Sequence, residues 1–384
     1  MGLRAAYVGL FTAIGALSAY LPLLYAARGL GLDLIGLLAG LYAAVAMLGA
    51  PAWGLVADAI GPRRPVVSIA AGAAAFAAVA LAFATGPFTL ALGAIALAVS
   101  MSGIMPIIDA QAVASEQARD AGYARLRVWG SAAFIGAVLV TGWLTDRFGA
   151  ASMFWLVAPA LAATAFVGLG TRAAAGPSRW NTSSLRALVR SRQLVAFLAA
   201  IFLTWTSSTT INAFFSIHLV DLDAPRWLVG VAWAIGAAVE IPIMLAYASI
   251  QRRFGLGRML VVGAALLLVR AAAVVIFGDP LFAALTMAIH GAGFALLIVG
   301  GVLYAARLAP PGTAATVQGL LVAIVFGLAQ VIGPGIGGLL ANRFGLATTF
   351  AVAGAGSLLA TLVLARVVAR GNHGGSPGSV VPGV

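Results

Sequence analysis

The sequence has very few charged residues. Only 8% of its 384 residues are Asp, Glu, Lys or Arg, whereas 62% are hydrophobic. A soluble domain carries about 25% charged residues, so a chain of this length could not cover a globular surface with polar side chains. Lipid must therefore be its solvent, and a soluble enzyme is excluded.

Cysteine and lysine are both absent, which excludes disulfides and thiol chemistry. All 22 basic residues are Arg, and the formal net charge is +12. In a soluble protein this charge would suggest nucleic acid. Here the arginines lie mainly in short loops between apolar runs. In membrane proteins, basic residues in such loops set the orientation of the chain across the membrane. We expect no nucleic-acid partner.

The sequence also lacks a metal-binding cluster, a nucleotide-cradling glycine loop and a nucleophile triad. We therefore expect no cofactor, no enzymatic activity and no use of ATP.

The apolar runs have the length of membrane-spanning helices. They extend for about 20 residues or more and lack the alternation of barrel strands. The first run is long for a signal peptide and further runs follow it, so we interpret it as an uncleaved helix. The predicted spans are 4–27, 34–57, 66–85, 88–116, 122–145, 150–171, 194–219, 227–250, 259–277, 281–306, 315–341 and 346–368.

The arginines are distributed unevenly between alternating loops. One set of loops, together with both termini, holds Arg4, Arg63, Arg64, Arg119, Arg172, Arg179, Arg186, Arg190, Arg192, Arg252, Arg253, Arg258, Arg307, Arg366 and Arg370. The other set holds only Arg28, Arg147, Arg226 and Arg343. Because cytoplasmic loops are rich in Arg and Lys, we predict a multi-pass protein of the plasma membrane, the inner membrane of the cell, with both termini in the cytoplasm.

Two similar halves are indicated by the longest polar segment and by a weak repeat. Residues 172–193 form a predicted cytoplasmic linker between bundles at 1–171 and 194–368, and residues 369–384 a disordered tail. The segment Gly142–Gly149, GWLTDRFG, recurs as GLLANRFG at Gly338–Gly345. We predict an all-α membrane protein with twelve helices in two pseudo-symmetric six-helix bundles, acting as a monomer.

A charged turn between the second and third spans carries a distinctive motif. Gly54 and Asp58 precede Gly61, and the basic pair Arg63 and Arg64 follows. Asp can cap or pair at a helix end, and Gly permits a tight turn. The pattern predicts a gating motif; the alternative is an ordinary charged turn.

A second group places an acid and two bases at matching depths in neighbouring spans. Asp109 lies near the end of the fourth span, and Arg125 and Arg127 lie just inside the fifth. A charge within the hydrocarbon is costly and is normally paired, and Arg suits substrate oxygens. We interpret these residues as a substrate-binding or gating pair. A structural pair, or arginines that reach the interface, is equally compatible with the spacing.

A third group lies in the second half, where Glu240, Arg270 and His290 occupy the eighth, ninth and tenth spans. Their depths agree within about 8 Å at 1.5 Å per residue. Since imidazole titrates near neutrality, the trio could relay protons. The alternative is a static buried triad that holds three helices together.

The seventh span contains a run of hydroxyl and amide side chains. Ser208 and Asn212 lie on one helical face at i, i+4 and are candidate substrate contacts in a water-filled cavity. Ser and Thr in a helix often bond to their own backbone instead, and for this run we favour that simpler interpretation.

These motifs together resemble the lactose permease and phenylpropionate permease branch of the major facilitator superfamily. The loop of Asp58 is similar to the cytoplasmic signature of that superfamily, with Pro62 where a basic residue is usual. The resemblance implies that Asp109 and Arg127, with Arg125 beside them, contact the substrate.

The resemblance also extends to the second half. The sequence departs from the pattern of the family at two positions, Gly293 and Phe134. The resemblance implies proton coupling by Glu240, Arg270 and His290, but Gly293 stands where the sugar permease has a further acid. Phe134 stands at the position of the tryptophan that stacks on sugar rings, which weakens a case for galactosides. The proton route therefore differs, or Glu240 carries the proton.

We expect a secondary transporter, a proton-coupled symporter of a small organic solute of the aromatic or organic acid, sugar or nucleoside class. One alternative is a proton-driven exporter. An alternative of another class is a membrane sensor or scaffold, against which the buried charges argue because a scaffold does not require them.

Overall fold

The computed structural model describes residues 2–60, 65–114, 122–169, 191–310 and 312–373. In these ranges the chain is helical, without β-strands. The first half comprises α1 (Gly2–Ala27), α2 (Leu32–Ile60), α3 (Val66–Phe83), α4 (Pro87–Ser102), α5 (Ile104–Ala114), α6 (Gly122–Phe148), the 3₁₀ turn η2 (Ala150–Met153) and α7 (Phe154–Gly168). The second comprises α9 (Arg192–Asp221), α10 (Arg226–Phe254), α11 (Leu256–Ile276), α12 (Pro280–Leu308), α13 (Ala314–Val322), the π-helical turn η3 (Ala323–Leu328) and α14 (Ala329–His373).

Twelve spans follow from these elements. Within the described residues, eleven stretches are long and apolar enough to cross a membrane, and the last of them, Ala314–Arg370, has 57 residues. At 1.5 Å per residue it would be about 86 Å long, whereas the hydrocarbon core is about 30 Å thick. Gly345, with a φ of 82°, interrupts the helix and divides it into two spans. The predicted fold class is confirmed.

Two glycines of the sequence repeat have the same backbone conformation. Gly149 ends α6 with a φ of 86°, and Gly345 ends the corresponding span of the second half with a φ of 82°. Only glycine adopts positive φ at little cost. The repeat therefore marks the same sharp reversal at the same place in each half.

The predicted fourth span, 88–116, is broken at Gly103 into α4 and α5. The indole Nε1 of Trp53 in α2 donates to the carbonyl of Val99 over 2.6 Å, the acceptor that the amide of Gly103 would use in a continuous helix. A Cβ at residue 103 would lie 2.3 Å from Cγ of Trp53. The break is caused by a neighbouring helix, so the local sequence does not reveal it.

The end of the last span also differs from the prediction. Helix α14 continues to His373, whereas we predicted a span to 368 and a tail from 369. Residues 374–384 of the predicted tail, and 172–190 of the predicted linker, lie outside the described residues.

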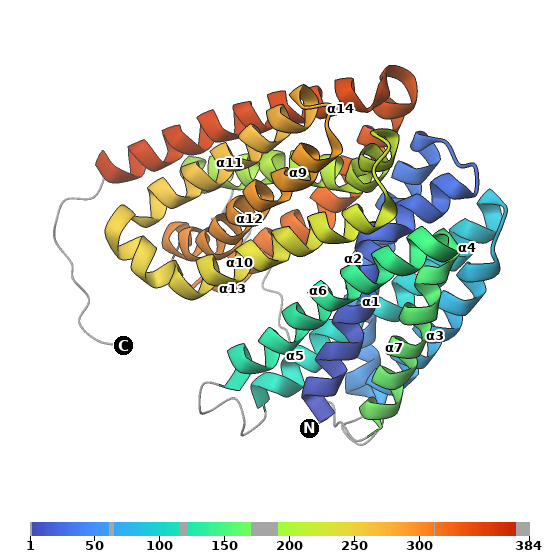
Figure 1. The fold of residues 1–384 in the computed structure, drawn as a ribbon. Coiled ribbons are helices and arrows are strands. Elements are labelled where there is room, and N and C mark those ends of the chain that lie inside the picture. The colour runs from blue at the N-terminus through green and yellow to red at the C-terminus, as the bar shows by residue number, and fades with distance from the viewer. Residues whose placement is uncertain (1, 61–64, 115–121, 170–190, 311, 374–384) are drawn as a thin grey trace.

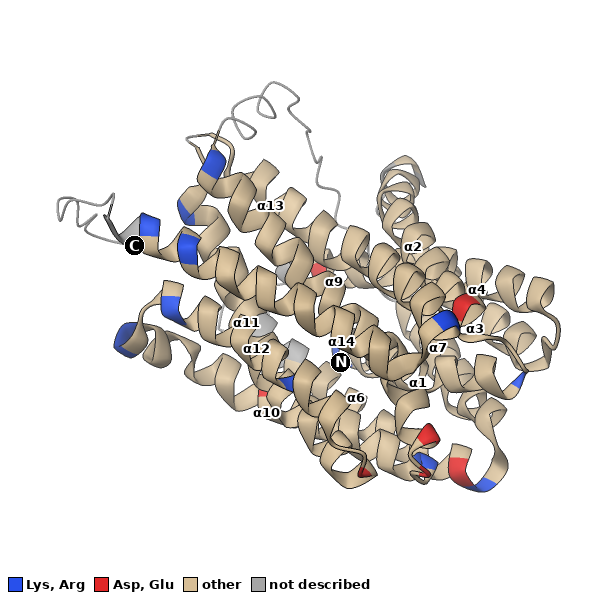
Figure 2. Ribbon diagram, turned by 90° about the horizontal axis from the view of Figure 1, so that it is seen from above, with Lys and Arg blue, Asp and Glu red and all other residues tan. Residues whose placement is uncertain are grey.

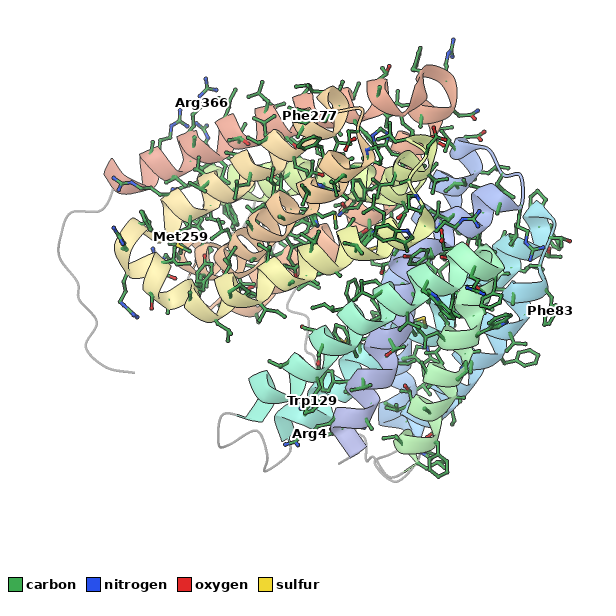
Figure 3. All side chains as sticks on the ribbon, in the orientation of Figure 1. Arg4, Phe83, Trp129, Met259, Phe277 and Arg366 are labelled. Carbon is green, nitrogen blue, oxygen red and sulfur yellow. The ribbon has the colours of Figure 1, made fainter. Side chains whose placement is uncertain are left out.

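The outer surface is suited to lipid. Large apolar side chains such as Phe83, 81% exposed, and Phe76, 77% exposed, project from the bundle, and Phe83 points outward in Figure 3. Charged residues gather mainly near helix ends, and most of each helix is free of them in Figure 2. This band without charge is what a bilayer requires.

The two halves meet at one end and diverge at the other (Figure 1). At the joined end α2 packs against α14 and α6 packs against α10. Glycines allow these close approaches: a Cβ at Gly36 would lie 2.2 Å from the carbonyl oxygen of Pro334, and one at Gly230 would lie 2.2 Å from that of Val138. The open end lies on the side of the chain's N-terminus.

Candidate functional site

A cavity of about 540 Å³ lies between the halves, next to the joined end. Helices α1, α2 and α4 line it from the first half, and α9, α10, η3 and α14 line it from the second. Both halves therefore contribute to one chamber, large enough for a small organic solute. Most of the lining is apolar, and its polar side chains are Ser18, Tyr25, Tyr42, Thr209, Asn212, Trp233 and Gln330.

Several of these polar groups are available to a solute. The Tyr25 hydroxyl and the Gln330 amide have no hydrogen-bond partner among the described residues, and the Tyr42 hydroxyl reaches only the sulfur of Met101, at 3.6 Å. Phenols and amides both donate and accept. No described residue that lines the cavity carries a formal charge, so the chamber offers hydrogen bonds without an ion.

Two side chains of the lining are held by neighbouring helices. Trp233 of α10 donates its indole N–H to the hydroxyl of Ser216 in α9 over 3.2 Å. Thr209 donates to the carbonyl of Ala329 in α14 over 2.9 Å. These bonds fix the orientation of an aromatic ring and of a hydroxyl at the wall.

Asn212 lines the cavity and also contacts a buried cation, Arg270, which does not line it. Its Oδ1 accepts a hydrogen bond of 2.7 Å from Nη1 of Arg270 in α11. Arg270 is 1% exposed. Its Nη2 contacts the sulfur of Met287 at 3.3 Å, and its guanidinium carbon lies 5.1 Å from the centroid of the Phe215 ring. Within the described residues no carboxylate pairs with it, and its Nε has no partner.

His290 of α12 completes this network. Its Nδ1 lies 3.1 Å from Nη1 of Arg270, and its Nε2 lies 3.4 Å from Nδ2 of Asn212. Arg270 can only donate, so Nδ1 must accept and the neutral ring carries its proton on Nε2. That proton faces the Asn212 amide nitrogen, another donor, which accounts for the longer distance. A second proton on His290 would face the guanidinium, so the ring is a poor proton carrier in this conformation.

Glu240 lies apart from the pair that Arg270 and His290 form. It is half-buried in α10, and it makes no hydrogen bond or ion pair with any described residue. One turn earlier, a Cβ at Gly236 would lie 3.2 Å from Cε of Met287, whose sulfur contacts Arg270. The predicted trio is thus a contacting pair, with the third member on an adjacent helix.

The predicted group in the first half is described only in part. Asp109 of α5 accepts a hydrogen bond from the Tyr7 hydroxyl of α1, and it does not line the cavity in this conformation. Arg125 and Arg127 belong to α6, but their side chains lie outside the described residues. The predicted contact between Asp109 and Arg127 stays a prediction.

Of the remaining predicted substrate contacts, Asn212 lines the cavity, whereas Phe134 and Ser208 do not. Phe134 packs against α1, where a Cβ at Gly15 would lie 3.3 Å from its Cδ2. Ser208 is 3% exposed, and its hydroxyl has no partner among the described residues.

The hydroxyl run on α9 has mixed roles. Thr204 bonds to the carbonyl of Ala200 in its own helix over 2.8 Å, as the simpler interpretation requires. Thr210 also bonds to the carbonyl of Gly333 in α14 over 3.0 Å. The run therefore ties α9 to α14 as well as to itself.

Of the gating motif, Gly54 is fully described, and it does not line the cavity. A Cβ at Gly54 would meet nothing within 4 Å. Asp58 belongs to α2, but its side chain is not among those described, and Gly61, Arg63 and Arg64 lie outside the described residues.

Sequence reasoning missed Tyr25, Tyr42, Trp233 and Gln330 as lining residues. Gln330 left a signal, since it is an isolated amide within an apolar span. The three aromatic residues left none, because membrane-facing belts use the same residue types.

A bundle of twelve helices, in two halves around a shared chamber, is the architecture of a transporter of the major facilitator superfamily. The chain belongs to the MFS_1 like family, which matches residues 1–352.

Individual relatives agree with this family. The chain is 28% identical over 342 residues to a maltose permease of Geobacillus stearothermophilus, covering 88% of this chain and 86% of that protein. It is 23% identical over 296 residues to the uncharacterized transporter YwbF of Bacillus subtilis (strain 168), covering 76% and 73%. Its fold is similar to that of the nucleoside transporter NupG, with a TM-score of 0.83 and 16% identity over 95% of this chain and 98% of that one.

Proposed function

We propose that this transporter carries a small uncharged organic solute with several hydroxyl groups, of the sugar or nucleoside class, together with a proton. The observation that carries the proposal is Asn212, which lines the chamber and bonds directly to Arg270 behind its wall. A solute at this amide can therefore influence a buried charge.

The lining favours an uncharged solute over an organic acid. Phenol and amide groups suit hydroxyls, and the apolar remainder suits the faces of a ring. An acid would favour a cation in the lining, and none of the described lining residues is one, because Arg270 bonds to Asn212 and lies outside the lining. The name of one relative, a maltose permease, supports the same choice.

The proton is assigned to Glu240. His290 faces the guanidinium of Arg270 through Nδ1, so a second proton there would bring two cations together. Glu240 is half-buried and has no cation paired with it among the described residues. Burial disfavours the charged form of a carboxyl group, and a carboxyl group in such a place can gain and lose a proton as its surroundings change.

Transport proceeds by alternating access, with the halves rocking about the chamber. The distribution of arginines supports a cytoplasmic location for the open end and both termini, and in that orientation this conformation opens inward. The protein acts in the plasma membrane as a monomer, because one chain encloses the chamber.

Binding to the purified protein tests the solute class. Maltose, uridine and benzoate represent a sugar, a nucleoside and an organic acid, and each is measured with the wild type and with Asn212→Ala. We expect saturable binding of maltose or uridine that is weakened in the variant. Saturable binding of benzoate alone would contradict the proposal.

A further inference from the structure

At the joined end of the molecule, two hydrogen bonds connect the end of α6 to the start of α10. Helix α10 begins at Arg226 after Pro225, which provides no side-chain cap. The amide of Arg226 donates instead to Oδ1 of Asp146, over 2.8 Å, and its Nη1 donates to the carbonyl of Thr145 over 3.2 Å. Helix ends carry unpaired backbone groups, and their dipoles favour an anion at the start and a cation at the end. Asp146 thus supplies the cap that α10 lacks, and Arg226 adds a second donor to the Thr145 carbonyl of α6, which already accepts from the Gly149 amide over 3.0 Å.

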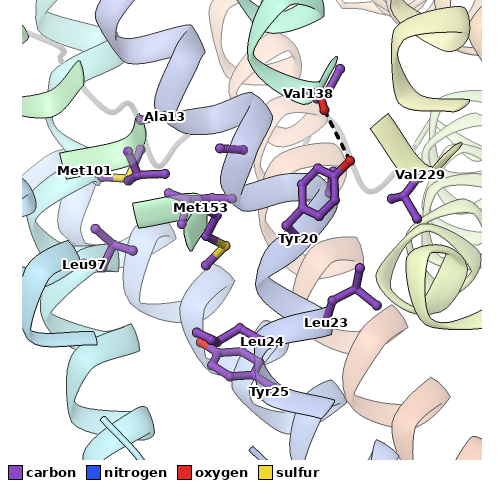
Figure 4. Packing of buried hydrophobic residues seen from close by; sticks show 14 of the residues in the cluster. Ala13, Tyr20, Leu23, Leu24, Tyr25, Leu97, Met101, Val138, Met153 and Val229 are labelled. Atoms are coloured by element: carbon purple, nitrogen blue, oxygen red, sulfur yellow. Dashed lines mark hydrogen bonds between the residues drawn. The ribbon is translucent and has the colours of Figure 1, made fainter. Parts of the chain in front are cut away.

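The hydroxyl of Tyr20 lies at the same junction. It is 3.2 Å from the carbonyl oxygen of Val138 and 3.2 Å from that of Arg226, and Figure 4 shows the first of these bonds. Tyr20 is fully buried. A phenol has one hydrogen to donate, so the two carbonyls share it. Val138 belongs to the same half as Tyr20, whereas Arg226 belongs to the other.

Two glycines make this sharing possible. A Cβ at Gly142 or at Gly230 would lie 2.7 Å from the Tyr20 hydroxyl. Gly142 follows Val138 by four residues, and Gly230 follows Arg226 by four residues. In a helix the residue four positions on lies beside the carbonyl. The absence of a side chain at both positions leaves both carbonyls open to Tyr20.

We propose that Tyr20, together with the junction of Asp146 and Arg226, is the latch that holds the joined end shut. When the halves separate, the hydroxyl keeps Val138 and releases Arg226, so no buried phenol is left unpaired. The capping groups lie at helix ends, where water replaces them. Opening therefore costs little free energy, and the latch sets the equilibrium between the two conformations.

The latch is also adjacent to the chamber. Ser18, Leu21 and Pro22 flank Tyr20 in α1 and line the cavity. A ligand that displaces this part of α1 moves the shared hydroxyl. The inference depends on the geometry of the junction and does not depend on the identity of the solute or on protons.

Distances between spin labels test the latch in the full chain in lipid nanodiscs. The absence of cysteine allows labels at chosen positions without background. The pair Ala27→Cys and Gly278→Cys reports on the joined end, and the pair Ala5→Cys and Ala306→Cys reports on the open end. All four positions are exposed.

We expect Tyr20→Phe to increase the population with a separated joined end about two- to tenfold, because one hydrogen bond typically contributes about 0.5–1.5 kcal/mol. For the open-end pair, the population with the shorter distance between labels should increase by the same factor. Asp146→Ala, at an exposed position, should also increase the population with a separated joined end. It replaces Tyr20→Phe in the test if that variant does not fold.

The matched control is Tyr247→Phe. Tyr247 is also buried, but its hydroxyl bonds over 3.5 Å to Leu296 within the second half, so its removal should leave both distributions as in the wild type. The proposal is overturned if Tyr20→Phe and Asp146→Ala both keep the wild-type distributions, or if Tyr247→Phe shifts them equally.

Discussion

Asn212 accepts a hydrogen bond from Arg270 over 2.7 Å while it lines the chamber between the halves. The side chain satisfies part of a buried guanidinium, and we propose that it also presents an amide to the solute. Since Arg270 has no carboxylate partner among the described residues, we expect the stability of the second half, as well as the binding of the solute, to depend on Asn212.

The first prediction separates these two functions. Asn212→Ala should weaken solute binding and also lower stability by about 1–3 kcal/mol, because a buried donor loses its acceptor. Gln330→Ala is the matched variant, since Gln330 lines the same chamber without a partner among the described residues. It should weaken binding at an unchanged melting temperature. Equal melting temperatures for both variants would contradict the structural function of Asn212.

The second prediction concerns the charged group of the first half. We expect Arg127→Ala to reduce solute binding sharply, because the change removes a ligand donor and leaves Asp109 without its predicted cation. Tyr7→Phe, which removes the hydrogen bond to Asp109 and leaves the arginine in place, should have the smaller effect. Isothermal titration of both purified variants measures this. Unchanged affinity in Arg127→Ala would show that Arg127 is structural.

The third prediction concerns the gating motif. Asp58→Asn should slow transport while membrane insertion stays nearly normal, because the predicted role of Asp58 is to pair with moving groups at a helix end. Initial uptake rates, normalised to the amount of inserted protein, provide the measurement. A well-inserted variant with wild-type rates would reduce Asp58 to a turn residue.

The helices were predictable because the thickness of the hydrocarbon core sets a minimum length for every span. Equal depth predicted that Arg270 and His290 share one level, and the i, i+4 spacing predicted a polar face that carries Asn212. Depth along the membrane normal is only one coordinate of a side chain, however. The direction in which the side chain points around the helix axis is another. Glu240 shares the predicted depth, but it pairs with neither Arg270 nor any other described residue.

The chamber itself could not be predicted residue by residue. In lipid the outer face of a helix is as apolar as its packed face, so Tyr25 and Trp233 could not be distinguished from belt residues. The break at Gly103 depends on Trp53 from another helix. The contacts of Tyr20 could not be predicted either, because its two carbonyl partners belong to distant segments.

The fourth prediction concerns Glu240, which we assign as the proton carrier. Glu240→Gln mimics the protonated side chain permanently, so the halves can still rock with the solute but cannot load or release a proton. Downhill exchange of radiolabelled solute should therefore persist in this variant. His290→Gln, which replaces the ring that contacts Arg270, serves as the comparison and should retain coupling.

Proton movement caused by the solute tests the central claim most directly. Proteoliposomes with a pH-sensitive dye inside receive an inward gradient of the solute that the wild type binds. The wild type should acidify the lumen as the solute enters, and Glu240→Gln should take up the solute without any change in internal pH. A change in pH that persists in Glu240→Gln, or its absence in the wild type during solute entry, would contradict proton coupling at Glu240.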